Sequence, residues 1–278
     1  MIACYCSELV ERIHPSLPFP CVFIHLKERI AMKGVLRLLD RECRRLQNKE
    51  HAKKMAKYFK YVHPFYGIKT ASLRQMIRQV QSKYQKDWNA SSLLDTAEQL
   101  LAESQGEKKL LGVYLLGVNS NLKILQNDPI VIDRLGGFIE TYVQDWATCD
   151  GLSTQVVRKL IEKNPAHATS VQTWCTCSND WKQRASCVSF VCLARHGAYN
   201  DLIVRIVAQV IQNRARFPQL GAGWVLRELS LADEPRVVTF ITKHYTEFTR
   251  EGLRYAIEKM DKPLQQKMLK YEPRREDN

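Results

Sequence analysis

The sequence predicts an all-α protein, and three observations predict it. Apolar residues recur at helical spacing along nearly the whole chain after residue 31, the breaks between these stretches are short and polar, and patterns typical of strands are nearly absent. The 278 residues are 45% hydrophobic and 26% charged, the proportions of a globular chain that buries a core. Scarce glycine (12) and proline (10) exclude collagen-like chains and low-complexity disorder.

The predicted helices follow one another at short intervals. Helical spacing begins at Met32, and the run 110–116 is apolar enough to predict an interior helix. Further apolar faces at helical spacing lie at residues 93–101, 130–143, 156–161 and 202–211. Polar breaks that end in proline separate them at residues 126–129, 163–165 and 232–235.

The lengths of these helices favour a repeat architecture. Helices of about 12–16 residues, paired roughly every 35–45 residues, are typical of HEAT-like repeats. We therefore expect an α–α superhelical solenoid with a concave basic groove, on which equivalent positions of successive repeats share one surface. A compact orthogonal bundle would give the same local patterns, so this alternative stays open.

Three segments are expected along the chain. Residues 1–31 contain Pro15, Pro18 and Pro20 and no sustained period, which predicts a loosely ordered or only partly helical leader. Residues 32–270 form the helical-repeat domain. Residues 271–278 form a polar tail.

The charge balance points to a polyanionic partner. Lys and Arg total 42 against 29 Asp and Glu, a net charge of +13, which favours nucleic acid first and an anionic membrane surface second. No apolar run is long enough for a transmembrane helix, and no helix combines a basic face with a bulky aromatic one, so we expect no membrane partner.

The nine cysteines form no disulfide framework, so a reducing cytoplasmic or nuclear compartment is expected. Cys175-x-Cys177 with Cys187, Cys192 and His196 departs from paired zinc-knuckle spacing. Buried thiols are therefore favoured over zinc, and no metal site is expected.

Tryptophan and arginine recur together in the second half of the chain. Trp181 and Trp224 each precede an arginine by three residues, Arg184 and Arg227, and we expect both pairs beside helix starts. Helix N–H groups, a guanidinium and an indole face together suit phosphate, sugar and base. The alternative is that each indole is a half-buried core residue and each guanidinium is solvated.

Asp150 is the one acidic residue in this set. Trp146 lies a turn before a helix start expected at residues 150–153, where either Asp150 or Ser153 would suit a cap. A carboxylate among cations and aromatic rings could instead stabilise a developing sugar cation or orient the water that attacks it.

From about Lys54 to Met260 the chain resembles the AlkD family of alkylpurine DNA glycosylases, which are built from HEAT-like repeats. The matching stretches are His63-Pro-Phe-Tyr-Gly-Ile-Lys69, Trp146-Ala-Thr-Cys-Asp150, Ser178-Asn-Asp-Trp181-x-x-Arg184, Gly223-Trp224-Val-Leu-Arg227 and Arg254-Tyr-Ala-Ile-Glu258. The resemblance implies that the chain hydrolyses the N-glycosidic bond of cationic purines such as 3-methyladenine and 7-methylguanine in duplex DNA, without flipping the base.

The resemblance also implies roles for single residues. Asp150 matches the catalytic carboxylate, and Trp146 and Trp224 match the aromatic residues that cradle the deoxyribose. Arg184 and Arg227 match arginines that grip phosphates. Trp181, Lys69 and Arg254 lie in the matching motifs and are expected to contact DNA. No cofactor is expected, and the partner is duplex DNA with alkylated bases, bound by a monomer.

Several features depart from the family or stay open. Gln183 and Ala71 stand where the family often has Arg and Pro. His63 has no acid at helical or hairpin spacing, which predicts a structural role. Lysines from residue 53 to 69 extend the groove or form an exposed face. A non-catalytic HEAT-like scaffold for nucleic acid or protein is the alternative function, and it does not need Asp150.

Overall fold

The computed structural model describes residues 19–271, and all regular structure in that range is helical. The prediction of an all-α protein is therefore confirmed. The first elements are α2 (Phe19–Leu46), α3 (Lys49–Tyr58), α4 (Thr70–Tyr84), η1 (Gln85–Asp87), α5 (Ala90–Ala102), α6 (Gly106–Leu116), α7 (Asn119–Leu125), α8 (Val131–Tyr142), α9 (Trp146–Leu152) and η2 (Ser153–Val157). The others are α10 (Arg158–Lys163), α11 (His167–Gln172), η3 (Thr173–Thr176), α12 (Asp180–Val188), α13 (Val191–Ala194), α14 (Asn200–Val210), α15 (Arg216–Leu229), α16 (Glu234–Lys243), η4 (Tyr245–Glu247), α17 (Arg250–Ala256) and α18 (Lys262–Leu269).

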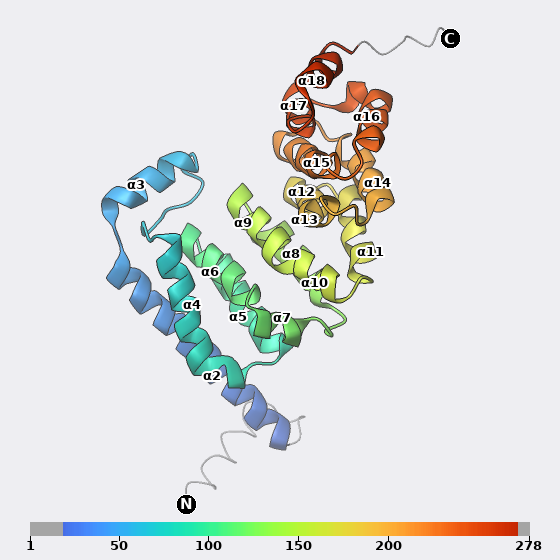
Figure 1. The fold of residues 1–278 in the computed structure, drawn as a ribbon. Coiled ribbons are helices and arrows are strands. Elements are labelled where there is room, and N and C mark those ends of the chain that lie inside the picture. Colours follow the sequence, from blue (N-terminus) through green and yellow to red (C-terminus); the bar gives the residue numbers. More distant parts are fainter. Residues whose placement is uncertain (1–18, 272–278) are drawn as a thin grey trace, which may run out of the picture.

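A row of contacting helices runs through the molecule. Helix α6 contacts α9, α9 contacts α12, α12 contacts α15, and α15 contacts α17. Helices α5, α8 and α14 pack beside this row, and the ribbon follows an arc from α2 to α18, with α3 projecting at one edge (Figure 1). The contacts fit paired helical repeats, whereas the complete superhelix and its basic groove stay predictions.

Helix α6 is the interior helix that the apolar run predicts. It buries charged residues as well as apolar ones, and each of these has partners. Glu107 accepts hydrogen bonds from the backbone N–H groups of Tyr66, Gly67 and Ile68 at 2.7–3.0 Å. Lys109 donates to two backbone carbonyls, and Lys108 pairs with Asp40. Because an unpaired buried charge is costly, these contacts fix α6 against its neighbours.

The loop between α3 and α4 makes a tight turn at Gly67. Its φ is +83°, and a Cβ atom would lie 2.1 Å from the carbonyl oxygen of Asn48. Only glycine combines this left-handed conformation with so close an approach. The turn returns the chain against the start of α3, where Asn48 N–H donates to the Tyr66 carbonyl at 2.8 Å.

Two expected helix starts are wrong. Helix α9 begins at Trp146, because the Asp145 side chain accepts a hydrogen bond from Thr148 N–H and caps it. Asp150 is therefore inside the helix and caps nothing. Trp224 lies in the middle of α15 rather than beside its start. The expectation is confirmed for Trp181, which follows the Asn179 cap of α12.

The expected leader and tail are only partly covered by the described residues. Helix α2 begins at Phe19 and continues through Met32, so residues 19–31 are helical and Met32 starts no element. Residues 1–18 and 272–278 lie outside the described residues. The division into three segments stays a prediction.

Close approach of α15 and α17 predicts an asymmetry between two glycine substitutions. In Gly223→Ala the new Cβ would lie 2.6 Å from the Gly252 carbonyl oxygen, so we expect a loss of about 1–3 kcal/mol in the free energy of unfolding. Gly137, in α8, has nothing within 4 Å of such a Cβ, and Gly137→Ala should gain about 0.5–1 kcal/mol. Denaturant unfolding measures both, and equal stabilities would contradict the predicted helix spacing.

Candidate functional site

One cavity collects most of the residues that the sequence singles out. Its volume is about 600 Å³, and it is lined from α9, α12, α15 and α17. The lining residues are Trp146, Asp150, Arg184, Arg216, Phe217, Leu220, Trp224, Glu251, Arg254, Tyr255 and Glu258. Five sequence-predicted site residues thus meet here, although they come from four separate helices.

The centre of the cavity is a paired carboxylate and guanidinium. Arg184 Nε and Nη2 donate to the two carboxylate oxygens of Asp150 at 2.8 and 2.9 Å, and Nη1 donates to the Phe217 carbonyl at 3.1 Å. The side chains are 6% and 15% exposed for Arg184 and Asp150. Both ends of the fork are therefore engaged, which fixes the direction of the carboxylate.

Burial sets the electrostatics of this pair. It raises the pKa of the Asp150 carboxyl, and the hydrogen bonds and charge of Arg184 only partly offset the rise. Burial would lower the pKa of Arg184, but the hydrogen bonds and charge of Asp150 outweigh it and hold the guanidinium pKa above its ordinary value. Arg184 is thus a permanent cation whose presence favours the ionised form of Asp150.

Helix α15 and the π-helix η2 lie next to the Asp150–Arg184 pair and shape its surroundings. Gly221 in α15 faces Arg184, and a Cβ there would lie 3.1 Å from Arg184 Cγ. After Asp150 the chain leaves α-helical geometry for the π-helix η2, and Thr154 Oγ1 donates to the Asp150 carbonyl at 2.6 Å. Such π-helical insertions are frequent at functional sites.

Aromatic rings form the sides of the cavity. Trp146 is 37% exposed and stacks on Phe59, with ring centroids 5.5 Å apart and planes at 19°. Tyr58 meets the same indole edge-on at 6.0 Å. Trp224 is half-buried and lines the same cavity together with Tyr255. Two indoles thus line the cavity that holds Asp150.

Two arginines of α15 are paired with carboxylates of α17 and of the turn that follows it. Arg216 donates to both oxygens of Glu251 at 2.8 and 2.6 Å, and Arg227 donates to Glu258 at 2.6 Å. The Arg227 guanidinium also lies 4.6 Å from the centre of the Tyr255 ring. These ion pairs were not anticipated from sequence, because the partners lie more than thirty residues apart.

Around Arg227 a second carboxylate gathers cations. The buried Glu228 accepts hydrogen bonds from Arg195, Arg227 and Lys259. Burial would raise the pKa of Glu228, but these hydrogen bonds hold it below its ordinary value. Three cations around one buried carboxylate leave this end of α15 positively charged.

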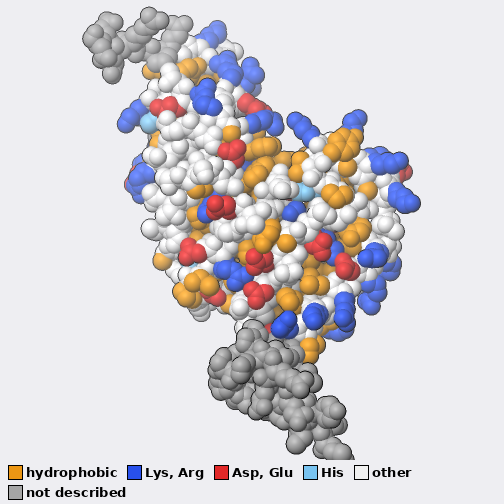
Figure 2. Space-filling model, turned by 180° about the vertical axis from the view of Figure 1, so that it is seen from behind, with side chains coloured by type: hydrophobic (Ala, Val, Ile, Leu, Met, Phe, Trp, Pro, Cys, Tyr) orange, Lys and Arg blue, Asp and Glu red, His pale blue; other side chains and the backbone are white. Residues whose placement is uncertain are grey.

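Three predicted DNA contacts lie outside the cavity lining. Trp181 packs on Phe217, with ring centroids 4.6 Å apart. Lys69 is exposed at the start of α4. Arg227 does not line the cavity itself, but it donates to Glu228 and to the lining residue Glu258. In the space-filling view, Lys and Arg spread along the half that contains α3 and flank the notch between that half and the C-terminal helices (Figure 2).

His63 has an acidic partner that the sequence did not indicate. Its Nε2 atom lies 3.0 Å from Asp145 Oδ2, and both side chains are buried. The partners are separated by 82 residues. No helical or hairpin spacing can reveal such a pair, because only the packing of the α3–α4 loop on α9 creates it.

The cysteines of the zinc alternative do not converge. Cys175 and Cys187 are buried free thiols, whereas Cys192 is exposed. Burial raises the pKa of Cys187 to about 12, so this thiol stays protonated. Within residues 19–271 no cluster of three or more metal-ligating side chains occurs. In the same range no helix has both the length and the hydropathy to cross a bilayer.

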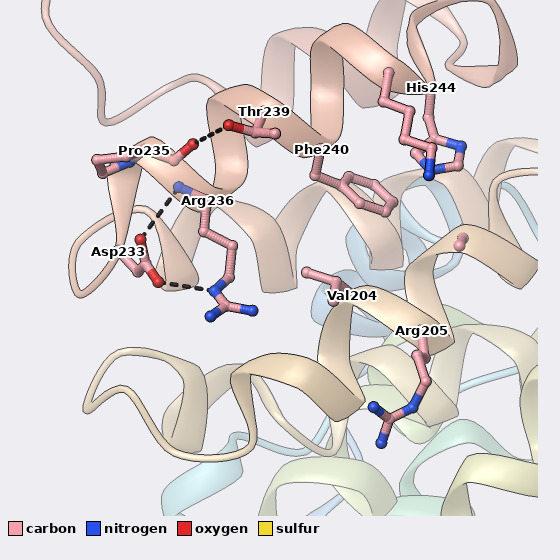
Figure 3. A pocket seen from close by; sticks show the side chains of 10 residues that line it. Val204, Arg205, Asp233, Pro235, Arg236, Thr239, Phe240 and His244 are labelled. Atoms are coloured by element: carbon pink, nitrogen blue, oxygen red, sulfur yellow. Dashed lines mark hydrogen bonds and ion pairs between the residues drawn. The ribbon is translucent and has the colours of Figure 1, made fainter.

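A second hollow lies away from these residues, between α14 and α16. Its volume is about 580 Å³, and Val204, Arg205, Phe240 and His244 are among its lining residues (Figure 3). Arg236 turns toward Asp233 and donates to it at 2.8 Å. None of the sequence-predicted site residues reaches this hollow.

The first cavity therefore defines a class of site: a partly buried carboxylate, held by a guanidinium and flanked by indoles, on a basic all-α protein. The chain matches the DNA alkylation repair enzyme family over residues 39–260 and belongs to that family. The suspected family is thereby confirmed, and with it a role in alkylation repair.

A solved structure supports the same fold. It comes from Enterococcus faecalis, is described as a predicted DNA alkylation repair enzyme, and superposes with a TM-score of 0.69. The two sequences are 16% identical, and the match covers 78% of this chain and 97% of that one. At this identity the likeness shows the fold alone. No curated protein matches the chain.

The buried pair predicts a pH-dependent loss of stability in Arg184→Gln. Without the guanidinium the buried Asp150 carboxylate is unpaired, so the free energy of unfolding should fall by about 3–5 kcal/mol at neutral pH. A carboxyl whose pKa is raised in the folded state binds its proton more tightly there. The deficit should therefore shrink as the pH falls through that raised pKa.

Thermal unfolding between about pH 8 and about pH 5 measures this trend. Arg216→Gln is the matched control, because its partner Glu251 is half exposed and an exposed pair contributes little. A deficit in Arg184→Gln that stays constant over this range would contradict the assigned role of the carboxyl.

Proposed function

We propose that this chain is a DNA glycosylase that hydrolyses the N-glycosidic bond of cationic alkylated purines, such as 3-methyladenine and 7-methylguanine, in duplex DNA. The observation that carries the proposal is the Asp150–Arg184 pair in a cavity that also holds Trp146 and Trp224. Membership of the DNA alkylation repair enzyme family supports it.

The chemistry of the substrate explains why this set of residues suffices. A purine alkylated at N3 or N7 already carries a positive charge, so it leaves with the electrons of the C1′–N bond without being protonated. Positive charge then develops on the deoxyribose. A carboxylate and two indole faces stabilise that charge through Coulomb and cation–π attraction in a partly dehydrated cavity. The reaction needs no metal or cofactor.

Asp150 has a second task in this mechanism. Water attacks C1′ as the base departs, forms the new C1′–O bond and loses a proton. An ionised Asp150 orients that water and accepts the proton. Arg184 keeps the carboxylate available by favouring its ionised form and holding both oxygens in place. We therefore assign to Arg184 the positioning of Asp150, and its contact with a phosphate stays a prediction.

Cations at the rim supply the affinity for DNA. Arg254 lines the cavity, is exposed, and pairs with no carboxylate among residues 19–271. Arg227 and the exposed Lys69 extend the basic surface. Trp181 packs against Phe217, which lines the cavity. Contacts with phosphates release counterions, so binding should weaken steeply as salt rises. The proposal includes a monomer that acts at the nucleoid, or in the nucleus of a eukaryotic source.

Asp150→Asn tests the catalytic role directly. The amide can still occupy the fork of Arg184 but cannot carry the negative charge, so release of methylated purines from alkylated duplex DNA should fall at least about 100-fold. Duplex affinity should change little. The measurement is chromatographic quantification of released bases over time.

Asp133→Asn is the matched control, since Asp133 is exposed on α8. It should release bases like the wild type. Unchanged release by Asp150→Asn would remove the carboxylate from the mechanism. Tight duplex binding without release by any of the three proteins would establish the non-catalytic scaffold instead.

Because Glu258 neutralises part of the charge of Arg227, we expect this carboxylate to lower the affinity for duplex DNA. In Glu258→Gln one counter-charge of Arg227 is lost, so duplex DNA should bind about 2- to 5-fold more tightly at low salt. Glu162→Gln is the control, because Glu162 pairs with Arg158 outside the cavity lining. Fluorescence anisotropy over a salt series measures both, and equal affinities would show that Arg227 stays out of reach of phosphates.

A further inference from the structure

We infer that His63 is a positioning residue of the candidate site: it holds the N-terminus of α9 and thereby aims Trp146 and Asp150 into the cavity. The inference rests on the proposed glycosylase function for its activity readout. Its structural content, a clamp between the α3–α4 loop and α9, is independent of that function.

The clamp is a buried network around one carboxylate. Asp145 Oδ1 accepts the Thr148 backbone N–H at 2.9 Å, which caps α9. Asp145 Oδ2 accepts the Thr148 hydroxyl at 2.7 Å and meets His63 Nε2 at 3.0 Å. His63 and Asp145 are 4% and 5% exposed. A carboxylate so buried needs every one of these partners.

The start of α9 depends on its capped end. Helix α9 has seven residues, of which Trp146 is the first and Asp150 the fifth, and it continues directly through the π-helix η2 into α10. Trp146 and Asp150 therefore lie in the first two turns of a helical segment that runs to Lys163. The first N–H groups of a helix have no partner within the helix, so this end is held by contacts from outside. Asp145 and its partners supply the fixed end.

His63 is itself held firmly. The Glu107 carboxylate binds the three backbone N–H groups of residues 66–68, and Gly106 N–H donates to the Pro64 carbonyl at 3.0 Å. Four residues before His63, Phe59 stacks on Trp146. The segment from Phe59 to His63 therefore contacts the start of α9 at two points, the capping residue Asp145 and the Trp146 indole.

Charge favours the same arrangement. Burial would raise the pKa of Asp145, but the hydrogen bonds from His63 and Thr148 lower it below its ordinary value. An ionised carboxylate interacts favourably with the N-terminal end of a helix. With Asp145 ionised, the His63 Nε2 atom carries the proton that it donates.

Two substitutions of His63 separate positioning from packing. His63→Phe keeps a ring of similar size but loses the Nε2 donor, whereas the amide of His63→Gln can donate at a similar distance from the backbone. We expect His63→Phe to lower kcat for base release about 10- to 100-fold with duplex Kd unchanged, because displacement of reacting groups by about 1 Å costs rates of this order. His63→Gln should recover most of the activity.

His167→Phe is the matched control. His167 is also buried, but its Nε2 atom has no hydrogen-bond partner. It should leave kcat unchanged. A wild-type kcat in His63→Phe, or a loss that His63→Gln does not restore, would overturn the inference.

Hydrogen exchange keeps the inference testable if the protein releases no base. In His63→Phe the amide of Thr148 should exchange at least about 10-fold faster than in the wild type, while amides of α12 keep their rates. Unchanged protection of Thr148 would overturn the clamp whatever the activity. Faster exchange at Thr148 without base release in any variant would support the clamp and remove the glycosylase proposal alone.

Discussion

A largely buried carboxylate at the centre of the cavity is the constraint on which the site depends. The proposed mechanism requires an ionised Asp150, yet burial raises the pKa of its carboxyl. The fork of Arg184 opposes that rise, and its third nitrogen is bound to the Phe217 carbonyl. The Arg184 side chain thus links α9, α12 and α15.

Some of the surplus positive charge is paired with carboxylates, and some of it is exposed. A net charge of +13 predicts a polyanionic partner, but along the edge between α15 and α17 the arginines already face carboxylates. The Arg216–Glu251 pair is half exposed, and an exposed pair contributes little to stability. The basic surface is therefore partly neutralised locally, and the cations of Arg254 and Lys69 remain exposed.

Much of this arrangement can be predicted from sequence. Helical periodicity is carried by the chain itself, so the all-α class and the interior helix at 110–116 follow from it. Five of the site residues predicted from the motifs also line the cavity. Helix starts are harder, because Asp145, Asp150 and Ser153 are all acceptable caps and only packing selects Asp145.

Contacts between residues far apart in the sequence cannot be predicted from hydrophobic periodicity. His63 and Asp145 are 82 residues apart, Arg216 and Glu251 are 35 apart, and Arg227 and Glu258 are 31 apart. Each residue type alone suggests a solvated or structural role. The pairs exist because successive helices stack, so a residue gains a partner at a distance fixed by the fold rather than by the local sequence.

Helix α9 shows how these constraints combine. Its cap is held by His63, its first indole by Phe59, and its carboxylate by Arg184. The first two come from the α3–α4 region and the third from α12, so residues far apart in the sequence hold the same helix. The π-helix that follows adds a residue to the turn and changes the face that the chain presents. Asp150 can therefore face the cavity while Val156 and Val157 are buried in the core.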